Sequence, residues 1–317
     1  MIANDTAPAA ETGVKRPRWH KLLLALSLVF LLVTLYRGNY ITIPHVFSPF
    51  ILVASLVALF AAFLAWCFSW ASLLSGASYP ISNRVAVAST GYSVFGKYIP
   101  GKLWTIVGRA TYVTHNYSYP LKVLSVLSLK SQVIDLWTGI LIGAIGLQLV
   151  GGSSGWGFVP LLVWLALTAA LFSEKPRKIL VHLYEKIVKR SINLDAFAGS
   201  SRMLGAILWS AATWALLAIG FYFLTVALTA HWPRWSVGLA FPMAGSLSIL
   251  VIFVHGGIGV REGLLTGFLT MAGLSVQDAA TVAVASRLWY LAGELFIFAF
   301  GLLADRFRGT SPTGKPA

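Results

Sequence analysis

The stretch HGGIGVREG, residues 255–263, lies between two long apolar segments and interrupts what would otherwise be a continuous hydrophobic helix. Glycines at 256, 257 and 259 permit an unwound or tightly turned backbone, and Arg261 and Glu262 follow directly. A membrane tolerates such a backbone only where it is buried in protein or lines a water-filled cavity. In a bilayer the stretch therefore predicts a polar re-entrant turn, with close helix packing as the alternative reason for the glycines.

The composition places the chain in a membrane. Of 317 residues, 57% are hydrophobic and 11% are charged, and the mean hydropathy is +0.78. A soluble domain with a polar surface does not have this balance. The net charge is +14, but the basic residues lie between apolar segments and form no basic domain, so we expect no nucleic-acid partner. The single cysteine, Cys67, excludes an intrachain disulfide and a cysteine metal cluster.

Apolar segments that approach bilayer-crossing length, about 20 residues each, recur along the chain. They lie at 21–36, 50–74, 130–150, 156–172, 204–229, 237–254 and 279–304. Two further regions, 84–115 and 263–273, are apolar but broken or too short to span alone. We predict an all-α, polytopic membrane bundle of about eight membrane-inserted units, some of them re-entrant or broken.

Charge asymmetry predicts the orientation of this bundle. The transmembrane domain is expected at 21–304, after a disordered basic N-terminus at 1–20 and before a short tail at 305–317. Lysine and arginine gather in the N-terminal segment and in the connector 174–202, so both termini and this connector are predicted to be cytoplasmic, in the inner (plasma) membrane of the cell. The connector is either an amphipathic helix on the inner membrane surface or a solvated helix.

The first broken region, YSVFGKYIPGKLWTIVGR at residues 92–109, predicts a site for an anion. Pro100 and Gly101 end one helix, and the next begins near Lys102. Lys102 and Arg109 then share a helix face, with Lys97 just before the break. Cations beside a helix N-terminus suit a phosphate, so these five residues are the predicted binding site for a lipid head group.

The charged residues of the second half need partners. Each would cost about 3 kcal/mol unpaired at the bilayer centre, and Arg287 and Glu294 lie two turns apart on one helical face. An ion pair from Arg287 or Arg261 to Glu294 or Glu262 would offset most of the cost, and either a structural bridge or a polar cavity explains the group. Asp135, the lone carboxylate of the first half, is expected to be a packing partner, for instance to Gln132 or Lys130. Because each half contains an apolar segment broken beside cations, two repeats around a central site are a further hypothesis. The predicted polar re-entrant site comprises His255, Gly256, Gly257, Gly259, Arg261, Glu262, Arg287 and Glu294.

Residues 255–296, HGGIGVREGLLTGFLTMAGLSVQDAATVAVASRLWYLAGELF, resemble the signature of the lysylphosphatidylglycerol synthase transmembrane family, also called flippase-like. The family pattern is roughly Pro-Gly-Gly-hydrophobic-Gly-x-x-Glu, a short helix, and a helix that opens with Arg. The element YIPGKLW followed by Arg109 is similar to the family's earlier Pro-Gly element, and the layout of apolar segments agrees over nearly the whole chain. This sequence has His255 where the family usually has proline. The matching positions are Gly256, Gly257, Gly259, Glu262 and Arg287.

The resemblance implies a polytopic fold with re-entrant helices. In the multiple peptide resistance factor, this fold moves an aminoacylated phospholipid between leaflets, and stand-alone members are linked to the export of hopanoids, glycolipids or polyprenyl-linked sugars. The soluble aminoacyl-transferring domain is not expected here, since the chain ends at Ala317 shortly after the last apolar segment. We therefore expect a protein that is not an enzyme and that does not itself synthesise lipid.

The predicted function is that of a lipid translocase for an anionic phospholipid, a glycolipid or an isoprenoid lipid. The alternative is a membrane glycosyltransferase, or an accessory subunit of a lipid or glycan assembly pathway. Against catalysis stand the ten acidic residues in all and the lack of an Asp-x-Asp motif for a metal-bound nucleotide sugar. We expect no cofactor and no metal, a membrane lipid as substrate, and a lipid-synthesis or glycosyltransferase protein as a possible partner. A scaffold role in a larger complex, the identity of the lipid and the oligomeric state stay open.

Overall fold

The computed structural model of the chain describes residues 45–98, 104–151, 158–172, 203–229, 231–250 and 260–306. Helices make up nearly all of these residues, and no strand occurs among them. Four helices are long and apolar enough to cross a membrane. They are α2 (Pro49–Gly76), α5 (Leu121–Gly151), α8 (Leu204–Thr229) and α11 (Val276–Arg306). The predicted all-α membrane bundle is confirmed.

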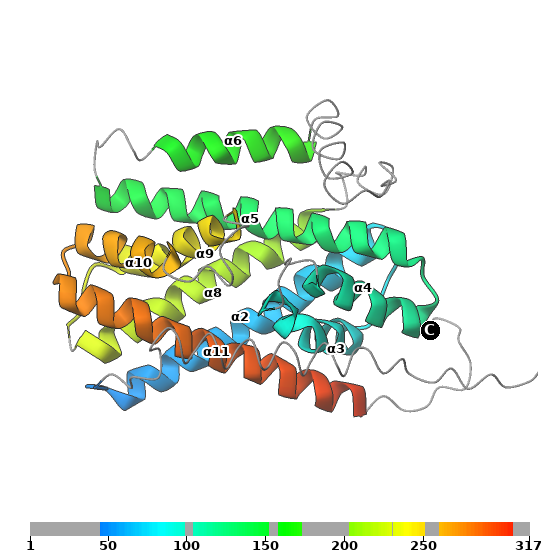
Figure 1. The fold of residues 1–317 in the computed structure, drawn as a ribbon, viewed down its shortest axis with the longest axis horizontal. Coiled ribbons are helices and arrows are strands. Elements are labelled where there is room, and N and C mark those ends of the chain that lie inside the picture. Colours follow the sequence, from blue (N-terminus) through cyan, green and yellow to red (C-terminus); the bar gives the residue numbers. More distant parts are fainter. Residues whose placement is uncertain are drawn as a thin grey trace, which may run out of the picture.

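The other described helices are shorter. They are α3 (Asn83–Ser93), the 3-10 helix η1 (Val94–Tyr98), α4 (Trp104–Tyr117), α6 (Val159–Phe172), the 3-10 helix η4 (Trp235–Leu239), α9 (Ala240–Leu250) and α10 (Val260–Met271). Local sequence features explain where two helices begin. Ser82 accepts a hydrogen bond from the Val85 amide and caps the N-terminus of α3, and Pro120 directly precedes α5. In Figure 1, α6 lies along the outer side of α5.

Several predicted segment limits are corrected by the structure. Helix α5 begins at Leu121, well before residue 130, because Lys122 and the serines of its first turns lowered the apparent hydrophobicity of a continuous helix. The expected span at 237–254 is, in its described part, η4 followed by the short helix α9. In its described residues, the region 84–115 consists of α3, η1 and α4. The segment 21–36, the N-terminus at 1–20, the connector 174–202 and residues 307–317 of the tail lie outside the described residues.

The chain contains two halves, α2 to α5 and α8 to α11, which have the same order of long and short helices but run in opposite directions. Each half runs from a long helix through two short ones to a second long helix, and α5 and α11 both have 31 residues. Helix α3 packs on α11 of the other half, α9 packs on α5, and α2 packs along α8. Figure 1 shows α5 and α11 on opposite sides of the α2–α8 pair, running in opposite directions. This inverted arrangement supports the hypothesis of two repeats.

Glycines allow the closest approaches between the halves. A side-chain Cβ at Gly143 of α5 would lie 2.5 Å from the Cα of Met243 in α9. In the corresponding contact of the other half, a Cβ at Gly91 of α3 would lie 2.6 Å from the carbonyl oxygen of Ile297 in α11. Neither site has room for a larger residue, so small residues determine the spacing of these helix pairs, as is common in membrane proteins.

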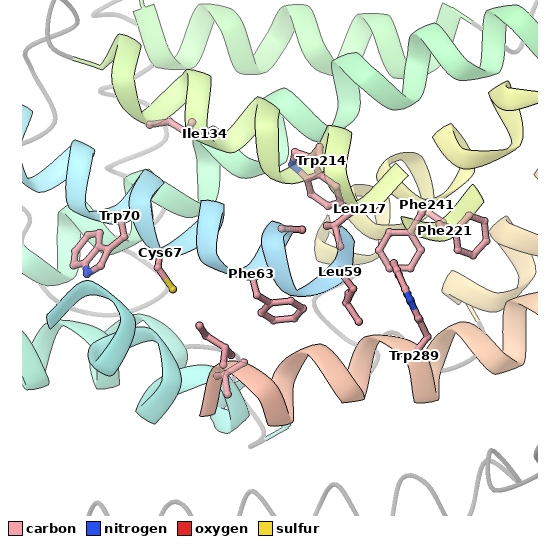
Figure 2. Close-up of a cluster of buried hydrophobic side chains, with 14 of the residues drawn as sticks. Leu59, Phe63, Cys67, Trp70, Ile134, Trp214, Leu217, Phe221, Phe241 and Trp289 are labelled. Carbon is pink, nitrogen blue, oxygen red and sulfur yellow. The ribbon is translucent and has the colours of Figure 1, made fainter. Parts of the chain in front are cut away.

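Apolar side chains fill the centre of the bundle. Figure 2 shows this core, with Phe63 and Trp70 from α2, Phe221 from α8, Phe241 from α9 and Trp289 from α11. The rings of Phe221, Phe241 and Trp289 contact one another at centroid distances of 5.2–6.3 Å. The outward faces are also apolar, as expected for surfaces that contact lipid.

Candidate functional site

A cavity of about 240 Å³ lies where the two halves meet. It is lined from α2, η1, α4, α5, α8, α9, α10 and α11, so both broken regions contribute to one space. Its walls combine aromatic rings with charged groups, which is unusual inside an otherwise apolar bundle. The charged residues that line it are Lys97, Asp135, Arg261, Arg287 and Glu294.

The first charged contact joins η1 to α11 across the halves. Lys97 Nζ forms an ion pair with Glu294 Oε1, and the hydroxyl of Tyr98 donates to Glu294 Oε2 at 2.7 Å. Lys97 also lies 4.6 Å from the ring centroid of Tyr290, within range of a cation–π contact. Glu294 is fully buried, whereas the Lys97 side chain is 35% exposed. Lys97 is thus the accessible member of a pair whose acid is fixed in the interior.

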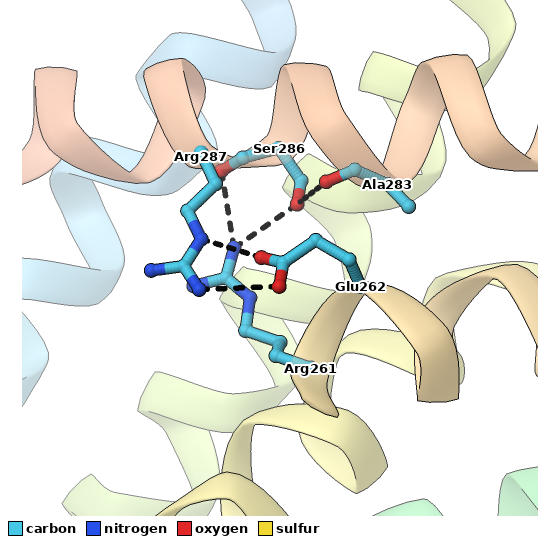
Figure 3. A network of polar contacts seen from close by, with 5 residues as sticks. All are labelled: Arg261, Glu262, Ala283, Ser286 and Arg287. Carbon is cyan, nitrogen blue, oxygen red and sulfur yellow. Dashed lines mark hydrogen bonds and ion pairs between the residues drawn. The ribbon is translucent and has the colours of Figure 1, made fainter. Parts of the chain in front are cut away.

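The second charged contact joins α10 to α11. Arg287 Nε forms an ion pair with Glu262 Oε1, and Arg287 Nη2 donates to Glu262 Oε2 at 3.2 Å, giving two parallel contacts between one guanidinium and one carboxylate (Figure 3). This is one of the ion pairs that the sequence left open. It connects the short helix that follows the glycine-rich stretch to the last long helix.

Arg261 differs from its neighbours because its guanidinium contacts no carboxylate among the described residues. Its Nη2 donates to the carbonyl oxygen of Ser286 at 3.2 Å and to Ser286 Oγ at 3.0 Å (Figure 3). The guanidinium lies 4.8 Å from the ring centroid of Phe241 and 5.4 Å from that of Tyr290. The residue is 8% exposed, and its Nε has no hydrogen-bond partner in the described part of the chain. Arg261 therefore lines the cavity with an unused donor and with a positive charge that no described carboxylate contacts.

Arg109, which was predicted as part of the head-group site, is buried. It is 2% exposed, and its guanidinium lies 4.1 Å from the ring of Trp70. Its Nη2 donates to the carbonyl oxygen and to Oγ of Ser128 on α5, at 3.2 and 3.0 Å. The same bonds join Arg261 to Ser286 in the other half. Arg109 does not line the cavity, because α4 directs this face toward α2 and α5.

Asp135 links three helices. Its carboxylate accepts a hydrogen bond from Trp66 Nε1 of α2 at 2.9 Å and one from Ser210 Oγ of α8 at 2.6 Å. The predicted partners, Gln132 and Lys130, are not the residues that bond this carboxylate. The Asp135 carboxylate therefore bonds residues of two neighbouring helices and not residues of its own helix.

The remaining predicted site residues lie outside the described residues. They are Pro100, Gly101, Lys102, His255, Gly256, Gly257 and Gly259. Their neighbours Tyr98, Arg261 and Glu262 are described and take part in the contacts above. The head-group site predicted at the first three positions and the polar re-entrant turn predicted at the other four stay predictions.

Sequence reasoning missed the neutral partners of the charged groups. Ser128, Ser286 and Ser210 each lie in an apolar helix and bond an arginine or a carboxylate. Tyr98 lies beside the predicted Lys97 but bonds an acid of the other half. The only available signal was a serine within a long apolar segment. This signal is not specific, because the hydroxyl of such a serine can instead bond a carbonyl of its own helix. The described residues contain no group of three or more His, Cys, Asp or Glu side chains placed to hold a metal ion.

The fold and this site define a polytopic helical membrane protein whose two inverted halves enclose a charged cavity. The chain belongs to the family described as the lysylphosphatidylglycerol synthase transmembrane region, which matches residues 19–301. This match covers both broken regions and all four long helices except the end of α11. No curated protein and no solved structure matches the chain.

Proposed function

We propose that the protein translocates a lipid with an anionic head group between the leaflets of the inner membrane. The observation that carries this proposal is Arg261, a buried cation in the cavity with no carboxylate partner among the described residues and with an unbonded Nε. The neighbouring cations Lys97 and Arg287 pair with Glu294 and Glu262, so Arg261 is the cavity cation whose charge no described carboxylate contacts. A phosphate would supply the missing acceptor.

The location of the cavity supports movement across the membrane. It lies between inverted halves beside two interrupted helices, which is where substrate sites of secondary transporters are built. The head group passes through the polar cavity while the acyl chains stay in the lipid outside the bundle. Lys97, the most exposed of the cavity cations, is the first to meet an entering head group.

The proposal assigns binding and movement to the chain and no chemical reaction. Lipid made by a separate enzyme is its substrate, so a lipid-synthesis or glycosyltransferase protein is the expected partner. Both termini and the connector 174–202 face the cytoplasm in this account, as the basic residues require.

Translocation by an Arg261→Gln variant tests this function. Purified protein in liposomes is supplied with a fluorescent phosphatidylglycerol in one leaflet, and the label that reaches the other leaflet is measured by quenching. We expect Arg261→Gln to lower the rate about tenfold or more, because a hydrogen bond to a charged group contributes about 1.5–3 kcal/mol. Arg261→Lys, which retains the charge, is expected to retain part of the rate.

Arg234→Gln is the matched control, since Arg234 is exposed in the loop before η4 and contributes nothing to the cavity. Its rate should equal that of the wild type. Thermal unfolding in detergent shows whether Arg261→Gln is folded. A folded Arg261→Gln variant that moves lipid at the wild-type rate rules out Arg261 as the anion site, and wild-type liposomes no faster than protein-free ones contradict translocation itself.

A further inference from the structure

Asp135 is a carboxylate in the cavity without a cation beside it. Both of its side-chain oxygens accept hydrogen bonds from neutral donors, Trp66 and Ser210. No lysine or arginine of the described residues lies within ion-pair distance of it, whereas Glu294 and Glu262 each have one. It is 8% exposed yet lines the cavity. Carboxylates of this kind inside membranes mark proton pathways in pumps and transporters.

The hydroxyl groups of Ser210 and Thr138 can form a continuous row of hydrogen bonds with Asp135 whether its carboxyl group is ionised or protonated. Ser210 Oγ lies 2.6 Å from Asp135 Oδ1 and 2.7 Å from Thr138 Oγ1, and either hydroxyl can be the donor in the second contact. Thr138 Oγ1 also lies 2.9 Å from the carbonyl oxygen of Ile134. When Asp135 is ionised, Ser210 donates to it and accepts from Thr138. When Asp135 is protonated, it donates to Ser210, Ser210 donates to Thr138, and Thr138 donates to Ile134.

In both protonation states, the hydroxyls of Ser210 and Thr138 each donate to a hydrogen-bond acceptor. The change needs only rotation of O–H bonds, with no movement of heavy atoms. Trp66 Nε1 holds the other carboxylate oxygen, and Trp214 Nε1 holds the Asp135 carbonyl at 2.7 Å, so the side chain stays in place. A proton can thus be bound and released here without leaving a buried polar group unsatisfied.

The charges around Asp135 couple its protonation to binding of the anionic head group. From the packed elements, Arg109 of α4 and Tyr290 of α11 are the titratable groups that act on it, and α2 and α8 present neutral donors. Lys130 lies on α5 itself, and Lys97, Arg261, Arg287 and Glu294 share the cavity. An anionic head group bound at Arg261 adds a negative charge to the same cavity, which favours the neutral form of Asp135. By linkage, protonation of Asp135 then favours binding of the anion.

We propose that Asp135 is the proton-binding site of the translocation cycle, taking up one proton with each anionic head group and releasing it when the head group leaves. The proton comes from water in the cavity, binds Asp135 Oδ1 and returns to water on the opposite side, so proton and lipid move in the same direction. This inference rests on the proposed lipid translocation and names its energy source.

Liposomes with a pH difference and with the membrane voltage held at zero by potassium and valinomycin test the proposal. For one proton per lipid, a difference of about one pH unit should enrich fluorescent phosphatidylglycerol up to about tenfold in the leaflet that faces the alkaline side. Asp135→Asn should show no such enrichment, because it cannot exchange a proton. Ser210→Ala should reduce it, because the hydroxyl chain is broken. Thr225→Val is the control, since Thr225 is a buried residue of α8 whose hydroxyl bonds only the Phe221 carbonyl of its own helix.

An infrared measurement separates this proposal from lipid translocation. The difference spectrum of wild-type protein between acidic and alkaline buffer should contain the C=O stretch of a protonated carboxyl group, and Asp135→Asn should lack it. Wild-type protein that moves lipid equally with and without the pH difference overturns the proton proposal and leaves translocation standing. If wild-type protein moves no lipid, the proposed function fails, and the infrared spectrum alone decides whether Asp135 binds a proton. A spectrum without a band that depends on Asp135 overturns the proposal in every case.

Discussion

Buried cations are stabilised in two different ways in this protein. Lys97 and Arg287 pair with Glu294 and Glu262, whereas Arg109 and Arg261 each bond a serine and lie over an aromatic ring. A buried ion pair balances the desolvation of two charges, so removal of one member leaves the other uncompensated. A serine and a ring satisfy donors without cancelling charge. The residue that is best placed to bind an added anion is therefore Arg261, which lines the cavity, and not Arg287.

Replacement of Glu262 by Gln tests the structural part of this distinction. We expect the free energy of unfolding to fall by about 3 kcal/mol or more, because Arg287 loses its carboxylate in a low-dielectric environment. The double variant Glu262→Leu, Arg287→Met should recover much of that loss, since it removes both charges. Thermal and denaturant unfolding in detergent measure both changes. Arg234→Gln, at an exposed arginine in the loop before η4, serves as control, and equal stability of Glu262→Gln and wild type would contradict the account.

Residue types predicted which charges are buried, but not all of their partners. Arg287 and Glu262 were paired correctly as one of several options, because ionisable residues in apolar sequence must find each other. Lys97 and Glu294 are 197 residues apart, and only the packing of η1 on α11 brings them together. Helix periodicity grouped Arg109 with Lys102, but periodicity does not show which face of a helix is covered by its neighbours.

At the level of helices, close packing depends on a few positions without side chains. Gly143 faces the backbone of Met243 where α9 crosses α5, and Gly91 faces Gly301 where α3 crosses α11. These crossings hold the short helices of one half against the long helix of the other. Three of these helices, α5, α9 and α11, also line the cavity.

Gly143→Ala should destabilise the protein, and Gly267→Ala should not. A methyl group at Gly143 would meet the Met243 backbone at 2.5 Å, and overpacking of this kind costs about 1–3 kcal/mol. At Gly267 of α10 a methyl group meets nothing within 4 Å, and alanine favours a helix by up to about 1 kcal/mol over glycine. Melting temperatures in detergent compare the two variants. Equal melting temperatures would show that the α5–α9 contact is less close than described.

The sequence predicted the long helices better than the short ones. Continuous apolar segments identified α2, α8 and α11 within a few residues. The apolar segment 237–254 looked like one span, because hydrophobicity does not distinguish a buried short helix from a membrane-crossing one. Breaks were predicted at Pro100, Gly101 and the glycines at 256, 257 and 259, because proline and glycine weaken a helix interior, and these positions lie outside the described residues.

For the whole molecule, the distribution of charge predicts which end of the bundle faces the cytoplasm. The start of α8 and the end of α11 lie at one end of the bundle (Figure 1), and the basic connector 174–202 directly precedes α8. The end of α8 lies at the opposite end (Figure 1), and the loop to η4, which contains Trp232, follows it in the sequence. Positive residues stay on the cytoplasmic side, so the first end is predicted to face the cytoplasm.

Cysteine labelling tests this topology. In a Cys67→Ala background, Leu180→Cys in the connector should react with an impermeant maleimide only after the cells are permeabilised. Trp232→Cys, at an exposed position, should react in intact cells. Reaction of Leu180→Cys in intact cells would reverse the predicted orientation.

Photolabelling by a lipid head group is the most direct test of the central claim, that the head group enters the cavity between the two halves at Arg261. An anionic phospholipid with a diazirine in its head group is irradiated in liposomes with the protein, and the labelled peptides are identified by mass spectrometry. We expect label on the cavity residues of η1, α10 and α11, reduced about tenfold in Arg261→Gln, because a charge-assisted hydrogen bond contributes about 1.5–3 kcal/mol. Label confined to the ends of the helices, and equal in wild type and Arg261→Gln, would contradict the claim.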